Sequence, residues 1–238
     1  MPLILGSYGA RNPMIVKMDM KSPNLTARLP LSNWVDVTID WGDGTTSSHT
    51  SNYPEHTYAA AGEYTIKITG KAGRLSRTTV SGGIVEYLQQ AGWPQLTEVV
   101  SFGELGATSM WGAFYGCVNL QKVADDFPSG VTNFSYMFHS CTSLTEIPEL
   151  DTSSGTNFGS MFFGCSSLTK GRLNGTRYSI SYNGCNLSHS AIVDIVDGLG
   201  TAVDSSQTLT FTNNPGTTSV STSEKNIAKN KGWTTNPA

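Results

Sequence analysis

The feature that most constrains this chain is a repeat of 24 residues in its second half. The four cysteines, Cys117, Cys141, Cys165 and Cys185, are separated by 24, 24 and 20 residues. An aromatic residue stands three positions before each cysteine, and a leucine stands three positions after the first three: Phe114, Phe138, Phe162, Tyr182, Leu120, Leu144 and Leu168. A fixed period in the twenties is typical of a solenoid, in which units too small to bury their own apolar faces stack on one another.

Stacking predicts that these phenylalanines, cysteines and leucines form buried columns one turn apart. The Leu-x-x-Ile/Val stretches are the expected strands, and the Met-Phe-x-x-Cys stretches are the expected short helical turns. Zinc binding and two disulfides are alternatives for the cysteines. Buried free thiols are favoured because there is no Cys-x-x-Cys pair and because equivalent Cβ atoms in a stack point the same way.

The segment from Met137 to Phe158 resembles the BspA-like leucine-rich repeats, which occur in bacterial surface proteins and in phage-encoded proteins. The resemblance implies a leucine-rich-repeat solenoid over residues 84–236, associates it with surface attachment and brings no catalytic residues. The C-terminal part departs from the period. There, an apolar pattern predicts a helix around 191–199 after Ser188, an alternating strand at 207–212 and a second helix at 223–230, which together suit a terminal cap.

The first third of the chain has a different pattern, with short apolar–polar alternations separated by Pro, Gly, Asn and Ser. This pattern predicts a small β-sandwich with strands at 14–20, 25–29, 34–41 and 64–68. The motif from Trp41 to Thr46, Trp-Gly-Asp-Gly-Thr-Thr, followed by His56-Thr-Tyr58, resembles the PKD domain, an immunoglobulin-like sandwich. We therefore expect three parts: an N-terminal arm at 1–13, a PKD-like sandwich at 14–80 and the solenoid at 84–236, with a Gly-rich linker at 81–83. The predicted fold class is mainly β with short helices.

The composition and the net charge exclude several classes of protein. Serine, threonine and glycine number 28, 28 and 25 of 238 residues, whereas charged residues make up only 14% and the formal net charge is −3. The small polar residues exclude a coiled coil, and the lack of a basic excess argues against a nucleic-acid binder. No segment has the roughly 18 consecutive apolar residues of a membrane span. The N-terminus has no cationic lead, so we expect no signal peptide.

The possible chemical sites each have a simpler structural interpretation. The histidines, His49, His56, His139 and His189, are scattered, and His56 is interpreted as a structural hydrogen-bonding residue. Asp40, Asp43 and Glu55 are a calcium alternative, but a turn aspartate is the commoner role and there is no EF-hand-like alternation. We expect no catalytic residues, no metal and no cofactor. A glycan hydrolase would need two carboxylates across a cleft, and no motif places them.

The function predicted from these features is that of a non-enzymatic phage virion structural protein involved in host attachment, of the tail-fibre or receptor-binding type. A capsid decoration protein and a bacterial surface adhesin are the alternatives. The expected location is the virion surface, which becomes extracellular after lysis. The candidate ligand-binding residues, for a host surface glycan or protein, are the solenoid aromatics outside the core columns: Trp111, Tyr115, Tyr136 and Phe163. The arm and the sandwich are expected to contact other virion proteins, with the arm held by a neighbouring subunit; homo-oligomerisation is left open.

Overall fold

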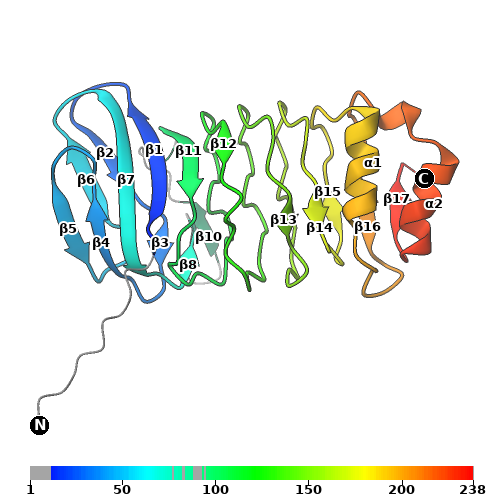
Figure 1. Cartoon of the computed structure of the whole chain (residues 1–238), viewed down its shortest axis with the longest axis horizontal. Coiled ribbons are helices and arrows are strands. Elements are labelled where there is room, and N and C mark those ends of the chain that lie inside the picture. The colour runs from blue at the N-terminus through cyan, green and yellow to red at the C-terminus, as the bar shows by residue number, and fades with distance from the viewer. Residues whose placement is uncertain (1–11, 77, 82–83, 88–92, 94, 238) are drawn as a thin grey trace, which may run out of the picture.

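The computed structural model describes residues 12–76, 78–81, 84–87, 93 and 95–237. The molecule is mainly β and elongated, with a sandwich at one end, a row of stacked turns in the middle and two helices at the other end (Figure 1). The predicted fold class is confirmed in this coarse form. Most of the expected N-terminal arm, residues 1–11, lies outside the described residues. No helix in the described part of the chain is long and apolar enough to span a membrane.

One layer of the sandwich belongs to a six-stranded sheet. Its order is β12-β11-β1-β7-β4-β5, with the bounds Lys122–Val123, Leu96–Ser101, Met14–Met20, Gly62–Lys71, Asp36–Asp40 and Thr46–His49. Alternate side chains of β1, from Met14 to Met20, are buried, because successive residues of a strand point to opposite faces. The opposite layer pairs β2 (Leu25–Arg28) with β6 (Glu55–Tyr58), and β3 (Leu31–Ser32) with β8 (Arg74–Leu75).

The strand expected at 34–41 begins two residues later. Asn33 and Trp34 have φ values of 62° and 64°, in the left-handed region that a bulky side chain rarely adopts. These two residues make the turn between β3 and β4, so regular pairing starts only at Asp36. The turn leaves the Trp34 side chain 86% exposed.

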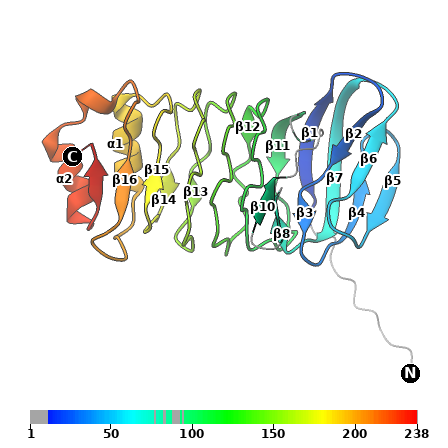
Figure 2. The ribbon, with the colours of Figure 1, turned by 180° about the vertical axis from the view of Figure 1, so that it is seen from behind.

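Both layers of the sandwich continue into the repeat. In the first layer, β11 pairs antiparallel with β1, and β12 pairs parallel with β11. In the second layer, β8 is followed by parallel bridges from Arg74 to Ser109, from Ser109 to Asn133 and from Asn133 to Asn157. Figure 2 shows β3 and β8 beside the first turns from behind. The linker expected at 81–83 therefore does not mark a break in hydrogen bonding, because strand pairs and bridges run from the sandwich into the repeat. A further hairpin, β9 (Thr78–Ser81) with β10 (Ile84–Tyr87), lies between the two parts in the sequence.

The 24-residue units stack as the sequence predicts. The Phe114 amide donates to the Met137 carbonyl at 2.9 Å, and the Phe138 amide donates to the Met161 carbonyl at 3.1 Å. The aromatic rings of Phe114, Phe138, Phe162 and Tyr182 stack in sequence, with centroids 5.5, 6.0 and 4.8 Å apart. All predicted members of the three columns are buried, which confirms the prediction of a buried core.

The cysteine column is made of free, buried thiols. The Cys141 Sγ donates to the Phe114 carbonyl at 3.1 Å, and the Cys165 Sγ donates to the Phe138 carbonyl at 3.0 Å, so each thiol contacts the preceding turn. The stretches before the cysteines are hydrogen-bonded turns rather than helices, since the Cys141 amide donates to the Phe138 carbonyl three residues back. The remaining repeat strands are short: β13 (Leu150–Asp151) pairs parallel with β14 (Leu173–Asn174).

The C-terminal end holds both predicted helices. Helix α1 (His189–Gly198) begins after the N-cap Ser188, and helix α2 (Thr222–Asn230) begins with a capping box between Ser221 and Glu224. A parallel sheet joins β15 (Ile180–Ser181), β16 (Thr208–Thr210) and β17 (Thr234–Asn236), and a 3-10 turn, η1 (Thr217–Ser219), lies before α2. The buried Trp233 donates its indole N–H to the Gly200 carbonyl at 2.8 Å and so ties the last strand to the loop after α1.

Candidate functional site

An aromatic row lies on the outside of the stacked turns. Its members, Tyr115, His139 and Phe163, follow directly after the core phenylalanines and are spaced by 24 residues. The core phenylalanines are fully buried, whereas Tyr115 and His139 are half-buried and Phe163 is exposed. The rings of Tyr115 and His139 stack with centroids 4.5 Å apart and planes 16° apart, and those of His139 and Phe163 with centroids 4.9 Å apart and planes 25° apart. We call these three residues the outer aromatic row.

Tyr136 lies against the middle of this row. Its ring centroid is 5.6 Å from that of His139, with the planes tilted by 32°. Its φ is 58°, and the equivalent residues Gly112 and Ser160 have φ values of 60° and 53°. The turn therefore imposes a left-handed backbone at this position, which glycine adopts easily and a bulky residue only at a cost in free energy. Tyr136 is only half-buried at this position.

Three of the four predicted ligand-binding residues thus come together around His139. The fourth, Trp111, is half-buried, and in the described part of the chain it makes no ring contact with the outer aromatic row. Sequence reasoning missed His139. The signal was present, because His139 lies 24 residues from both Tyr115 and Phe163.

His139 behaves as a neutral aromatic ring. Burial lowers the pKa of its imidazole, and its Nδ1 lies 2.9 Å from the Ser140 hydroxyl. At neutral pH the row therefore carries no charge. The two faces of His139 are covered by its neighbours in the row, and the most exposed member is Phe163, whose side chain is 57% exposed.

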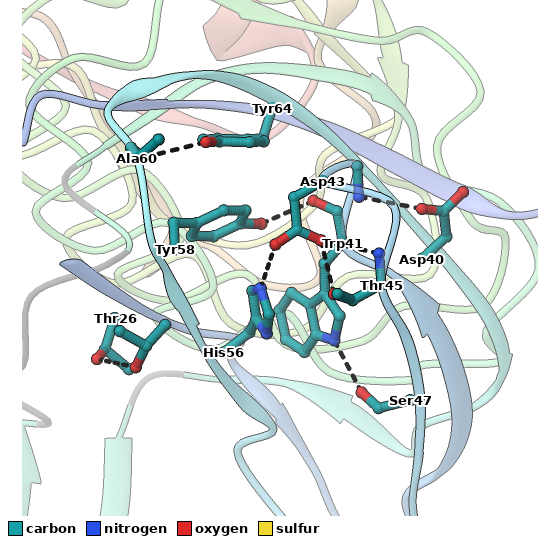
Figure 3. A network of polar contacts seen from close by, with 12 residues as sticks. Thr26, Asp40, Trp41, Asp43, Thr45, Ser47, His56, Tyr58, Ala60 and Tyr64 are labelled. Atoms are coloured by element: carbon teal, nitrogen blue, oxygen red, sulfur yellow. Dashed lines mark hydrogen bonds and ion pairs between the residues drawn. The ribbon is translucent and has the colours of Figure 1, made fainter. Parts of the chain in front are cut away.

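A second polar cluster lies in the sandwich, around the turn after β4 (Figure 3). The Asp43 Oδ2 accepts from the His56 Nε2 at 2.7 Å, and its Oδ1 accepts from the amide and the hydroxyl of Thr45 at 3.0 and 2.6 Å. The His56 ring stacks on that of Trp41 with centroids 4.9 Å apart. The Tyr58 hydroxyl donates to the Trp41 carbonyl at 2.8 Å, which joins β6 to the same turn.

The glycine of this turn is required sterically. Gly42 has a φ of 80°, and a Cβ atom there would lie 2.5 Å from the Thr65 carbonyl oxygen. Burial alone would raise the pKa of Asp43, but the hydrogen bonds from Thr45 and His56 lower it to about 2. The bond between Asp43 and His56 therefore holds the turn against β6. His56 thus has the structural hydrogen-bonding role that is expected of it from the sequence.

The three acids of the calcium alternative have other partners. Asp40 accepts from the Gly42 amide at 3.0 Å, both Asp43 oxygens are bonded as described, and Glu55 lies 2.9 Å from the Arg28 guanidinium. Among the described residues, no three His, Cys, Asp or Glu side chains gather in a way that could hold a metal ion. The structure thus gives this alternative no support.

Comparison with known families identifies one part of the chain. Residues 21–81 match the family model of the PKD domain. The PKD domain is a β-sandwich, which agrees with the two layers described above. The Trp41–Asp43 turn and His56 therefore belong to the PKD domain, whereas the outer aromatic row lies outside it. No curated protein and no solved structure matches the chain significantly.

Proposed function

We propose that this chain is a non-enzymatic attachment protein on the surface of a phage particle, and that residues 84–236 are a leucine-rich-repeat solenoid that binds a host surface glycan or protein. The outer aromatic row, Tyr115, His139 and Phe163, is the observation that carries the proposal. These residues repeat with the period of the turns, yet they lie outside the core columns, which are complete without them.

The composition of the row supports binding. Aromatic side chains give large contact areas at a low cost in conformational entropy, and they are enriched at the centres of interfaces. Tyr136 supports the same interpretation, because a tyrosine occupies a left-handed position where glycine or serine stands in the neighbouring turns. Backbone strain of this kind is concentrated at functional sites.

The ionisable groups support a binding role over catalysis. A hollow of about 560 Å³ on the β11–β12 face contains Glu98, Glu146 and Glu149. A glycan hydrolase needs one carboxyl group held protonated, whereas the hydrogen bond from Lys17 lowers the pKa of Glu98, and all three carboxylates lie in ion pairs. The pairs join Glu98 to Lys17 and Lys122, Glu146 to Lys170, and Glu149 to Arg172. The cysteine thiols are buried, and burial raises the pKa values of Cys165 and Cys185, so these two are poor nucleophiles.

The sandwich end is proposed to face the particle. Trp34 supports this assignment, since its side chain is 86% exposed on a left-handed backbone in the turn between β3 and β4 of the sandwich. An exposed tryptophan is a typical anchor in protein interfaces. Contact with other virion proteins through this end would leave the stacked turns free to meet the host.

Two measurements test the proposal. The first locates the chain on purified particles with a chain-specific antibody and electron microscopy, and the second measures binding of the purified protein to host cells. We expect label on the tail and binding that falls at least tenfold in a His139→Ala, Phe163→Ala double variant. The control is Val118→Ala, which removes an exposed apolar side chain of the first turn without touching the row.

Each alternative predicts a different result. Label on the head without host-cell binding would show a capsid decoration protein. Label on bacterial cells and none on particles would show a surface adhesin. Equal binding by the double variant and by the control would refute the role of the outer aromatic row.

A further inference from the structure

We infer that one uncharged pyranose ring of a glycan stacks on the outer face of Phe163 and is held there by the amide side chains of Asn183 and Asn213. This inference rests on the proposed attachment function and names the ligand class and the binding position. It follows from the way in which the outer aromatic row ends.

The row has three members because the fourth turn breaks the pattern. The interval from Cys165 to Cys185 is 20 residues rather than 24. Tyr182 nevertheless takes the core position, since its ring stacks on that of Phe162 with centroids 4.8 Å apart. The residue that follows Tyr182, in the place of the next outward ring, is Asn183. The outer face of Phe163 therefore has no aromatic neighbour on this side among the described residues.

The side chain of Asn183 is held by the turn beyond it. Its Oδ1 accepts from the Thr212 hydroxyl at 2.9 Å and from the Asn213 Nδ2 at 2.8 Å. Two amide side chains are thus fixed beside the level at which a fourth ring would lie. Asn213 is exposed, with a left-handed φ of 58°, so its side chain is presented to solvent. The site consists of one free aromatic face with a border of amides.

The chemistry of these groups selects a sugar. A pyranose ring presents a face of C–H groups that packs on an aromatic ring, while its hydroxyls at the periphery both donate and accept hydrogen bonds. An amide side chain offers both functions, and the partners of the two asparagines leave N–H groups and an oxygen that can turn to a ligand. Phe163, Asn183, Thr212 and Asn213 carry no charge, and the adjoining His139 is neutral at pH 7, which favours an uncharged sugar over an acidic one.

Phe163 is the most exposed ring of the row. The two faces of His139 are covered by Tyr115 and Phe163. Tyr115, at the other end of the row, is half-buried, whereas Phe163 is 57% exposed. The site is therefore assigned to Phe163.

Saturation-transfer NMR with the full-length protein tests the inference. The probes are the methyl pyranosides of glucose, galactose, mannose and N-acetylglucosamine, each titrated separately. We expect at least one to bind through ring C–H protons. Its affinity should fall about tenfold in Phe163→Ala, as expected for a lost stacking contact, and also in Asn183→Ala. Val118→Ala is the control and should bind as the native protein does. Matching thermal unfolding curves would show that all variants are folded.

The outcomes separate this inference from the proposed function. If no pyranoside binds but host-cell binding still requires Phe163, the attachment role stands and the sugar inference is overturned in favour of a protein receptor. If a pyranoside binds at Phe163 but the protein does not bind host cells, the site is correct and the attachment role is wrong. Pyranoside binding that survives both Phe163→Ala and Asn183→Ala overturns the assigned site.

Discussion

Replacing Phe138 by alanine tests whether the stacked core stabilises the molecule as described. The side chain of Phe138 is fully buried, and its two faces stack on Phe114 and Phe162 at 5.5 and 6.0 Å. Truncating a buried phenylalanine to alanine lowers the free energy of unfolding by about 3–5 kcal/mol, because apolar contact is lost and a cavity remains. Both stacking partners lose a neighbour here, and the backbone hydrogen bonds between turns oppose collapse, so we expect about 4–5 kcal/mol.

Phe163→Ala is the matched control. It removes the same side chain from the same turn, but Phe163 is 57% exposed and stacks on one ring only. Since less than half of its surface is buried, we expect a loss of about 1 kcal/mol. For a chain of this length, each kcal/mol corresponds to about 2 °C in Tm, so the two variants should differ by about 6–8 °C.

Denaturant unfolding followed by tryptophan fluorescence, together with calorimetry, measures both losses. The full curve is needed because a stacked array can unfold in more than one step. If Phe138→Ala costs no more than Phe163→Ala, the ring column does not carry the stability assigned to it. An unchanged free energy of unfolding in both variants would refute the stacking of the turns as a source of stability.

Two further predictions concern titratable groups. The cysteine thiols should not react with a disulfide reagent in the native protein and all four should react after unfolding, because they are buried and the pKa of Cys185 is raised to about 12; rapid labelling of the native protein would contradict the buried column. The pKa of Asp43 is lowered from 3.8 to about 2 in the folded state, so its contribution to stability is present above about pH 4 and is lost as the pH falls toward 2. The stability difference between the native protein and Asp43→Asn should therefore shrink between pH 4 and pH 2 in denaturant unfolding, and a difference independent of pH would contradict the Asp43–His56 link.

The sequence predicted those parts of the fold that local or periodic patterns encode. The 24-residue spacing placed Phe138 and its equivalents in a buried column, and alternation placed β1 and β7 in the sandwich. The left-handed pair Asn33 and Trp34 was not predicted, because a bulky tryptophan is unusual at such positions and the alternating pattern of 34–41 begins with Trp34.

The joining of the sandwich to the repeat could not be predicted either. It depends on the pairing of β1 with β11, in which Lys17 lies opposite Glu98, 81 residues away. No sequence pattern in either strand indicates which strand it pairs with, since edge strands pair through backbone groups that every residue carries. In the candidate site, Tyr115, Tyr136 and Phe163 were predicted from their aromatic character outside the columns. His139 was missed because a histidine was considered for its chemistry and not for its position in the period.

The shared ladders set an order of events during folding. Once β1 and β7 have paired, the free edge of β1 is a template on which β11 aligns, and each added turn then offers an edge to the next. Folding should accordingly begin in the PKD domain and advance toward α2. Pulsed hydrogen exchange during refolding can measure this order. We expect the amides of β1 and β11 to become protected before those of the turns at 133–165. The reverse order would show that the repeat nucleates by itself.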